Sequence, residues 1–423
     1  MTKIDRRTLL QYTATAATYV ALTRPGFAQQ PNRGIIDDAL AAAVDRGDIP
    51  GVSAAVTDAT GTIYENAFGK RRLGGAQAMT VDTVCYLASM TKPITATCAM
   101  QLVEQGKLDL DSPISRWIPS AAKLQVLDGF DANGKPNLRA PTREVTLRDL
   151  MTHSSGFAYT LWDENLVKYA NAVAGGDSLP ALDYDDDATW LQPLMFDPGS
   201  RWEYGISIDW IGRLVQTVSG ESLGGYMKQH IFDPLGMTST GFKLSPDMEA
   251  RRASSHQRDE SGQLAATDWV SDQDPPREYG GGGLYGDVSD YQRFMRMILN
   301  KGTGNGNRIL KADTVAEMTR NNLGTVRVEM LYTTNPARSL DAEFFPGLEK
   351  SWGLSFMINE KAAPTGRPAG SLAWAGIQNT FFWIDLRNEI GGVFMSQVFP
   401  FVDTKALQAF YDFETAYYKA AAD

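Results

Sequence analysis

Hydrophobic residues follow strand-like patterns at both ends of the chain and a helical period in its middle. Near the start, residues 51–58 and 62–68 are predicted as two strands of a hairpin around a Thr-Gly turn. The last third returns to strand patterns, at residues 352–358, 371–375, 379–386 and 390–397. Strands at both ends with helices between them predict one sheet built from the two termini.

Amphipathic helices are predicted where apolar residues recur with the helical period. The first, residues 32–46, stops at Gly47, and another, residues 89–105, stops at Gly106. Further helices are predicted at residues 146–151, 208–218, 223–232, 288–299 and 405–421.

The middle of the chain is punctuated by proline and glycine and is mostly helical. Within it, residues 129–141 and the acidic run 183–187 are predicted surface excursions. The fold class is therefore α+β, with an antiparallel sheet from both termini flanked by helices and a mostly helical second lobe. We place the sheet lobe at about residues 29–92 and 274–423, the helical lobe at about 93–273, and both in a single domain, 29–423.

The first 28 residues differ in kind from the rest. Residues 5–11 contain a twin-arginine pattern, followed by a short apolar run and the small residues of Gly26-Phe27-Ala28. The run is too short and too polar to anchor the chain in a bilayer. We predict a twin-arginine signal peptide at residues 1–28, cleaved after Ala28, and export to the periplasm or the medium. The alternative is an uncleaved cytoplasmic N-terminus.

Charge limits the partners that the protein can bind. The 423 residues carry a formal charge of −10, and removal of residues 1–28, which carry +3, lowers it to about −13. An acidic surface repels phosphate backbones and anionic lipids. Nucleic acid and membrane surfaces are therefore disfavoured as partners, and a small-molecule substrate is expected. The sequence does not indicate an oligomeric state.

Neither a disulfide nor a metal site is indicated. Cys85 and Cys98 are the only cysteines, and their positions are more typical of small buried side chains than of a disulfide. His153, His230 and His256 are scattered without metal-ligand spacing. We predict no metal and no cofactor.

Ser89 and Lys92 form a Ser-x-x-Lys pattern where an apolar run meets a predicted helix. Side chains three residues apart on a helix share one face, with Cβ atoms roughly 5–6 Å apart. A serine becomes nucleophilic when a base removes its proton, and burial and the helix N-terminus both disfavour a charged lysine. Unpaired amides there, including that of Ser89, favour an oxyanion. The pattern predicts a nucleophile, against the alternative of a helix N-cap beside a solvated lysine.

A second Ser-x-x-Lys, at Ser120 and Lys123, shows that the pattern alone is weak evidence. This copy follows Pro119 and sits among loop-like residues, without an apolar strand before it or a long helical pattern after it. We interpret it as a chance occurrence. Wider context must therefore decide the role of Ser89.

Several segments, taken in order, resemble the serine β-lactamase and penicillin-binding superfamily, most closely its class C-like branch with the family VIII carboxylesterases. The resemblance covers nearly the whole mature chain, and several ordered matches are far more specific than any single one. It implies a β-lactamase/DD-peptidase-like fold and a catalytic domain. The segments that carry it are residues 89–93 (Ser-Met-Thr-Lys-Pro), 101–111, 150–156, 196–204, 234–237 and the glycine run 280–283.

The resemblance assigns roles to four of these residues. Tyr204 matches the tyrosine of the second motif, Tyr-x-Asn, and would share the proton of Ser89 with Lys92 before passing it to the leaving group. Free phenol has a pKa near ~10, so either nearby cations stabilise the phenolate or Lys92 is the primary acceptor; both alternatives stay open. The backbone amides of Ser89 and Ile377 would form the oxyanion hole.

The second and third motifs depart from the β-lactamase pattern. Ile206 stands where asparagine would bind a substrate amide, and the Trp-x-Gly of Trp374 and Gly376, similar to that of family VIII esterases, replaces Lys-Thr-Gly. An indole carries no positive charge, so it cannot form an ion pair with a substrate carboxylate as the lysine of Lys-Thr-Gly can. Ile206, Trp374 and Gly376 are predicted to bind substrate, although Trp374 could instead be a buried strand residue. Tyr159, for the acyl pocket, and Asp209, for orienting the site, are weaker candidates.

Together these residues predict an exported serine carboxylesterase that cleaves neutral, short-chain carboxylic esters through an acyl-enzyme intermediate. Alternatives of the same fold are an acyltransferase, a β-lactamase and a D-alanyl-D-alanine peptidase, and Ile206 and Trp374 argue against the last two. A non-catalytic ligand sensor is the alternative of another class. A Ser-His-Asp triad is not predicted, because the chain lacks a Gly-x-Ser-x-Gly elbow and His153 matches a structural segment of the family.

Overall fold

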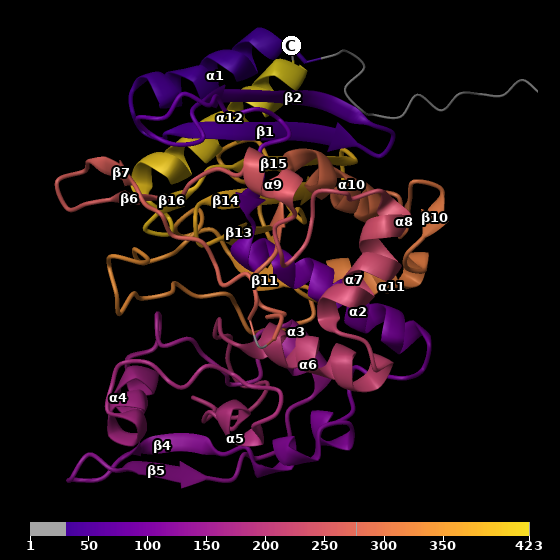
Figure 1. Cartoon of the computed structure of the whole chain (residues 1–423). Coiled ribbons are helices and arrows are strands. Elements are labelled where there is room, and N and C mark those ends of the chain that lie inside the picture. Colours follow the sequence, from indigo (N-terminus) through magenta and orange to yellow (C-terminus); the bar gives the residue numbers. More distant parts are fainter. Residues whose placement is uncertain (1–30, 276, 423) are drawn as a thin grey trace, which may run out of the picture.

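A seven-stranded antiparallel sheet forms the centre of the computed structural model, which describes residues 31–275 and 277–422. Both ends of the chain contribute strands to it, as predicted (Figure 1). The predicted signal peptide, residues 1–28, lies outside the described residues. In spatial order the strands are β11 (Lys350–Trp352), β12 (Met357–Asn359), β13 (Leu372–Gly376), β14 (Thr380–Asp385), β15 (Ile390–Met395), β1 (Gly51–Asp58) and β2 (Thr62–Gly69).

Helices cover both faces of the sheet. Neighbouring residues of a strand point to opposite faces, and on β14 the Phe382 ring lies 5.2 Å from Tyr291 of α10, whereas the Trp383 ring lies 5.5 Å from Phe413 of α12. Strands β13, β14 and β15 are consequently buried along their whole length. The flanking helices are α1 (Arg33–Asp45) and α12 (Thr404–Ala422) on one face and α10 (Val288–Leu299) on the other.

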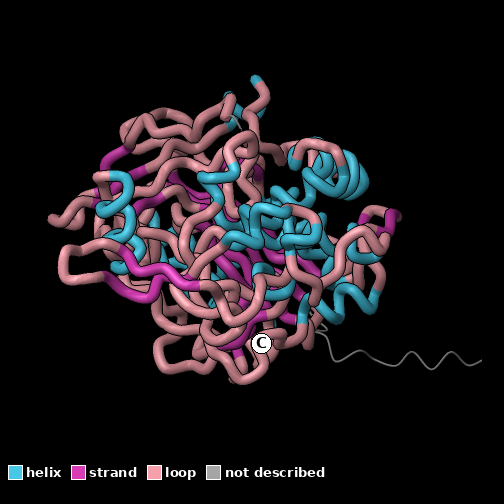
Figure 2. Tube along the Cα trace, turned by 90° about the horizontal axis from the view of Figure 1, so that it is seen from below, coloured by secondary structure: helices cyan, strands magenta, loops and turns pink. Residues whose placement is uncertain are grey.

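A second, mostly helical lobe lies below the sheet in Figure 1, and long loops join its elements (Figure 2). No helix of the described residues is both long and apolar enough to cross a membrane. Cys85 and Cys98 are buried, as predicted, and are free thiols. The remaining helices are α2 (Lys92–Glu104), α3 (Leu147–Met151), α4 (Glu164–Ala174), α5 (Asp187–Trp190), α6 (Ser207–Ser219), α7 (Leu223–Met227), α8 (Asp233–Leu235), α9 (Pro246–Arg251) and α11 (Ala312–Thr319).

One predicted strand is divided in the structure, and one predicted surface excursion contains regular structure. The single strand predicted at residues 352–358 is two short strands, β11 and β12, because the chain reverses where the Gly353 amide donates to the Phe356 carbonyl at 2.8 Å. The excursion predicted at residues 129–141 contains part of a hairpin. The short strands outside the main sheet are β3 (Cys85–Tyr86), β4 (Val126–Phe130), β5 (Pro136–Arg139), β6 (His256–Arg258), β7 (Leu264–Ala266), β8 (Tyr285–Gly286), β9 (Thr303–Gly304), β10 (Asn307–Arg308) and β16 (Val398–Phe399).

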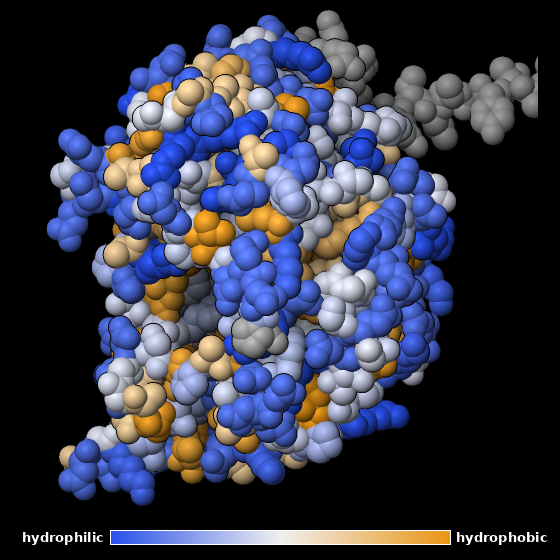
Figure 3. Space-filling model, in the orientation of Figure 1, coloured by the Kyte–Doolittle hydropathy of each residue, from blue (hydrophilic) through white to orange (hydrophobic). Residues whose placement is uncertain are grey.

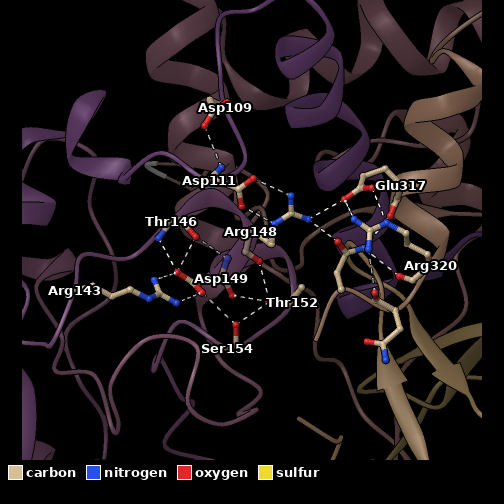
Figure 4. A network of polar contacts seen from close by, with 12 residues as sticks. Asp109, Asp111, Arg143, Thr146, Arg148, Asp149, Thr152, Ser154, Glu317 and Arg320 are labelled. Carbon is tan, nitrogen blue, oxygen red and sulfur yellow. Dashed lines mark hydrogen bonds and ion pairs between the residues drawn. The ribbon is translucent and has the colours of Figure 1, made fainter. Parts of the chain in front are cut away.

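A network of ion pairs fixes the position of α3 (Figure 4). Arg148 of α3 pairs with Asp111 at 2.7 Å and with Glu317 of α11 at 2.8 Å. Asp149 accepts from Arg143 and closes a capping box with Thr146 at the start of the same helix. Partly exposed pairs contribute at most about 1 kcal/mol each, so the main consequence is geometric. The network fixes where α3 begins and holds the helix against α11.

Candidate active site

Ser89 lies on a 3-10 turn rather than at the first turn of an α-helix. The Leu87 amide donates to the Leu284 carbonyl at 2.8 Å, residues Ala88–Thr91 form the turn, and α2 begins only at Lys92. Ala88 has a φ of 48°, which is unusual for a residue with a side chain. This sharp bend corrects the prediction that the helix starts at Ser89. The turn nevertheless keeps Ser89 and Lys92 on one side.

The Lys92 side chain is fully buried and points at Ser89. Its Nζ lies 3.1 Å from Ser89 Oγ and donates to the Gly281 carbonyl at 2.6 Å. Burial lowers the pKa of Lys92 from 10.5 to about 7, although the nearby Asp209 carboxylate opposes the shift. A large share of the molecules therefore holds a neutral amine at neutral pH. Such an amine can accept the proton of Ser89.

Tyr204 approaches the same two side chains from the helical lobe. Its ring centroid lies 4.6 Å from Lys92 Nζ, and its hydroxyl accepts from the Trp374 indole N–H at 3.0 Å. Ser89 lies within hydrogen-bonding reach of the phenol. Burial nevertheless raises the pKa of Tyr204 above its usual value, so the phenol keeps its proton at neutral pH. Of the two alternatives that the sequence left open, the structure favours Lys92 as the primary proton acceptor.

Tyr159 and Asp209, the weaker candidates, both lie at this centre. The Tyr159 hydroxyl lies 3.4 Å from Lys92 Nζ and donates to Asp209 at 3.3 Å, and Asp209 also accepts from the Gly281 amide at 3.0 Å. A Cβ on Gly281 would lie 2.6 Å from the Asp209 carboxylate. Residue 281 must therefore be glycine for its two polar groups to join Asp209 to Lys92. Sequence reasoning missed this link, although the glycine run was visible.

The end of β13 packs closely against the nucleophile turn, the 3-10 turn at Ala88–Thr91 with the preceding Leu87. A Cβ on Gly376 would overlap the Leu87 carbonyl and the Thr380 hydroxyl, so only glycine fits there. This close approach brings the start of the segment after β13, at Ile377, next to the residues that precede Ser89. The proposed oxyanion hole, formed by the amides of Ser89 and Ile377, is compatible with this arrangement and stays a prediction.

Comparison with known proteins decides the family. The chain matches the family model described as beta-lactamase over residues 36–417. This chain belongs to the beta-lactamase family. Acyltransferase mokF of Monascus pilosus is 31% identical over 374 residues, covering 85% of this chain and 89% of that protein. Lovastatin esterase of Penicillium rubens is 32% identical over 371 residues, covering 85% and 91%.

Solved structures agree with the assignment. A mutant of simvastatin synthase from Aspergillus terreus superposes with a TM-score of 0.77 at 29% identity, covering 92% of this chain and 94% of that one. The predicted superfamily and fold are thereby confirmed. The protein is an enzyme of the serine beta-lactamase-like family, whose members related to this chain include both acyltransferases and esterases.

Two positions separate this chain from the β-lactamase pattern within the family. The Trp374 indole N–H donates to the Tyr204 hydroxyl, and the tryptophan is only 4% exposed. Ile206 is 7% exposed and directly precedes α6, where its carbonyl accepts from the Asp209 amide at 3.0 Å. Neither residue offers a polar group to a substrate amide or carboxylate. Substrate contact by Ile206 stays a prediction, since its side chain packs in the hydrophobic core.

A small pocket, with room for about one water molecule, lies beside Trp374. Most of its wall is apolar, and of its charged residues Lys350 and Glu343 pair with each other at 3.3 Å. Figure 3 shows a hollow on this face between the sheet lobe and the helical lobe. The pocket is lined by Trp202, Val328, Glu329, Leu331, Ala342, Glu343, Phe344, Lys350, Met357, Trp374 and Phe401.

His153 packs against the catalytic centre without taking part in a triad. Its ring centroid lies 4.7 Å from that of Tyr204, and neither ring nitrogen has a hydrogen-bond partner among the described residues. Burial, together with Lys92, lowers the pKa of His153 well below its usual range, so the ring stays neutral. No group of three histidine, cysteine or carboxylate side chains in the described ranges could hold a metal ion.

Proposed function

We propose that the protein is a serine carboxylesterase that forms an acyl-enzyme on Ser89 from neutral, short-chain carboxylic esters. The observation that carries the proposal is the buried Lys92 ammonium 3.1 Å from Ser89 Oγ, with a pKa of about 7. A serine beside such a lysine is activated without a histidine. The mostly apolar wall of the small pocket beside Trp374 supports the choice of an uncharged ester.

In the proposed reaction, neutral Lys92 accepts the Ser89 proton as Oγ attacks the ester carbonyl. The oxyanion forms beside the amides of Ser89 and Ile377. Tyr204 gives its proton to the departing alcohol and regains one from the Lys92 ammonium, which returns both groups to their starting states. A water then attacks the acyl-enzyme, with Lys92 again accepting the proton, and the acid is released.

An alcohol can replace water in the second step, and we propose acyl transfer as a second activity of the same intermediate. Support comes from the relatives, which include an acyltransferase and an esterase at similar identity. Nothing in the residues around Ser89 distinguishes the two acceptors. The partition is measured by adding increasing amounts of a simple alcohol to an ester assay and comparing free acid with new ester.

The most direct test is detection of the acyl-enzyme by intact mass after exposure to a small panel of p-nitrophenyl esters. We expect a mass increase equal to the acyl group, located on Ser89 by peptide mapping, and no increase in Ser89→Ala. An adduct on another residue, or turnover that survives Ser89→Ala, would contradict the proposal.

A β-lactam substrate is the main alternative within the family. A side-by-side assay of a short p-nitrophenyl ester and a chromogenic cephalosporin separates the two. We expect the ester to be turned over faster, because Trp374 and Ile206 remove two polar substrate contacts. Faster cephalosporin turnover would reverse this ranking.

We also propose export through the twin-arginine pathway, from the pattern at residues 5–11. Fusing residues 1–28 to a reporter that is exported only when folded tests this. Replacement of Arg6 and Arg7 by lysine should abolish export, and export that persists in the double variant would contradict the assignment.

A further inference from the structure

Arg338 is a half-buried cation that has no ion-pair partner among the residues the structure describes. Its guanidinium lies 4.1 Å from the centroid of the Phe399 ring, and burial lowers its pKa. Of the carboxylates near this segment, Asp403 pairs with Arg258 at 2.5 Å, and Asp341 accepts from the Thr333 amide at 2.8 Å. In an acidic protein, a partly desolvated guanidinium without a counter-charge is costly unless something else supplies one.

The loop that carries Arg338 crosses between the two lobes at the catalytic centre. On one side of Arg338, the Thr334 hydroxyl donates to the carbonyl of Thr160, the residue after Tyr159, at 2.6 Å. On the other side, Ser339 accepts from the Trp162 indole at 3.1 Å. The Trp162 ring in turn lies 5.6 Å from that of Tyr204. Arg338 is therefore held between two anchor points that both adjoin catalytic side chains.

Tyr86 links the Arg338 guanidinium to the nucleophile turn. The Phe399 ring, on which the Arg338 guanidinium stacks, lies 6.3 Å from the Trp269 ring, and Trp269 packs against Tyr86. The Tyr86 hydroxyl lies 3.9 Å from the point where a Cβ on Gly282 would sit, and this point is 3.8 Å from the Ala88 carbonyl. The Tyr86 ring is only partly buried and lies 5.1 Å from that of Trp269, which is also partly buried.

We propose that Arg338 binds a carboxylate carried by the ester substrate, with Tyr86 and Trp269 flanking the group that bears it. A guanidinium pairs with a carboxylate through two parallel hydrogen bonds, which fixes orientation as well as charge. Arg338 is not among the residues that line the Trp374 pocket, so the proposed anion site is separate from that pocket. This inference rests on the proposed acyl-enzyme on Ser89 and replaces the expectation of a wholly neutral substrate.

The carboxylate can belong to the alcohol part or to the acyl part of the ester, and three substrates distinguish them. The first, 4-nitrophenyl butanoate, is neutral; the second, 4-carboxyphenyl butanoate, carries the anion on the alcohol; the third, mono-4-nitrophenyl glutarate, carries it on the acyl group. For each ester the wild type is compared with Arg338→Gln, so differences in intrinsic ester reactivity cancel.

We expect Arg338→Gln to lower kcat/KM roughly tenfold for one of the two anionic esters, mainly through KM, because a charge-assisted bidentate contact is lost. Turnover of the neutral ester should change by less than about twofold. Arg338→Lys should recover part of the loss, since it keeps the charge but not the fork. The anionic ester that responds identifies the part of the substrate that faces Arg338.

Arg387→Gln is the matched control, because it removes the same charge far from the site. Arg387 follows the end of β14, whereas the opposite end of this strand, at Thr380, contacts Leu87 beside Ser89. It should leave all three esters unaffected. Equal losses on all three esters in Arg338→Gln, or no loss on either anionic ester, would overturn the inference while the enzyme still turns over esters. Absence of any turnover and of any Ser89 adduct in the wild type would instead contradict the proposed function itself.

Discussion

The chain contains two copies of the same catalytic pattern in two different environments. Ser89 with Lys92 and Ser120 with Lys123 have the same spacing, and each serine lies on a 3-10 turn, Ala88–Thr91 and Pro119–Lys123. Lys92 is fully buried, whereas Lys123 is exposed to solvent. Spacing and local conformation therefore do not distinguish a nucleophile from an ordinary surface turn.

The difference lies in what the rest of the fold brings to each lysine. Lys92 meets the Gly281 carbonyl, Tyr159 and the ring of Tyr204, all distant in sequence. Those groups remove water, and the loss of solvation lowers the pKa of the ammonium to about 7. At the second copy no hydrogen bond joins serine to lysine among the described contacts, and Arg213 is the main group that holds the pKa of the nearby Asp187 low. Burial of the lysine, rather than the Ser-x-x-Lys spacing, therefore makes it able to accept the serine proton.

The largest expected effect separates the two serines. Ser89→Ala should lower ester turnover by about 10⁴-fold or more, because the covalent route is lost entirely. Ser120→Ala should change it by less than about twofold, because its hydroxyl faces neither a base nor a substrate pocket. Initial rates on a p-nitrophenyl ester, with circular dichroism of both variants, measure this. A comparable loss in Ser120→Ala would show that the second turn is not a bystander.

Replacing the two lysines should give a smaller difference in kcat than replacing the two serines. Lys92→Met keeps the length of the side chain and removes the amine, so kcat should fall by about 10²–10⁴-fold, the usual contribution of a positioned base. Lys123→Met removes an exposed ammonium and should leave kcat unchanged. Single-turnover acylation rates report this step directly. Retention of fast acylation in Lys92→Met would move the role of base to Tyr204.

Sequence reasoning recovers the fold because its signals are local and repeated. The alternating segments around residues 51–68 and 371–397 predict a sheet from both termini, and β1 indeed pairs with β15, Ser53 opposite Met395. The first motif and the tyrosine of the second are equally visible, since each stands in a run of matched residues. Where the prediction erred, at the strand that divides into β11 and β12, a single chain reversal decided the outcome.

The sequence could not predict the link from Asp209 through Gly281 to Lys92. That link depends on a loop and a helix that are distant along the chain and meet only in the folded molecule. The same holds for Arg338, whose meaning comes from the absence of a described carboxylate partner. Such features carry no spacing signal, because the residues do not share an element.

Replacing Lys92 should lower activity but raise the free energy of unfolding, whereas replacing Lys123 should change neither. The pKa of Lys92 falls from 10.5 to about 7 on folding, so between those values the unfolded chain binds more protons and stability rises with pH. Below pH 7 the buried ammonium carries its full cost, and Lys92→Met should raise the unfolding free energy by roughly 2 kcal/mol. The gain should shrink as pH approaches 10.5, and Lys123→Met should show no such gain.

Urea unfolding at pH 6.5 and pH 9.5 measures that effect. The midpoint of Lys92→Met should exceed that of the wild type at the lower pH and approach it at the higher one. A difference that does not depend on pH would mean that packing rather than charge sets the cost of Lys92.

The smallest expected effect comes from replacing the carboxylate near each Ser-x-x-Lys pattern, Asp209 near Lys92 and Asp187 near Ser120. Asp209 raises the pKa of Lys92, so Asp209→Asn should lower it and move the acid limb of the kcat/KM profile, expected near pH 7, to lower pH by less than about one unit. Asp187→Asn, the equivalent change beside Ser120, should leave the limb in place. If Asp209 acted only by holding Gly281, its variant would lower kcat without moving the limb. A limb that stays at the wild-type pH would therefore assign Asp209 a purely positional role, and the charge around Lys92 would be set by burial alone.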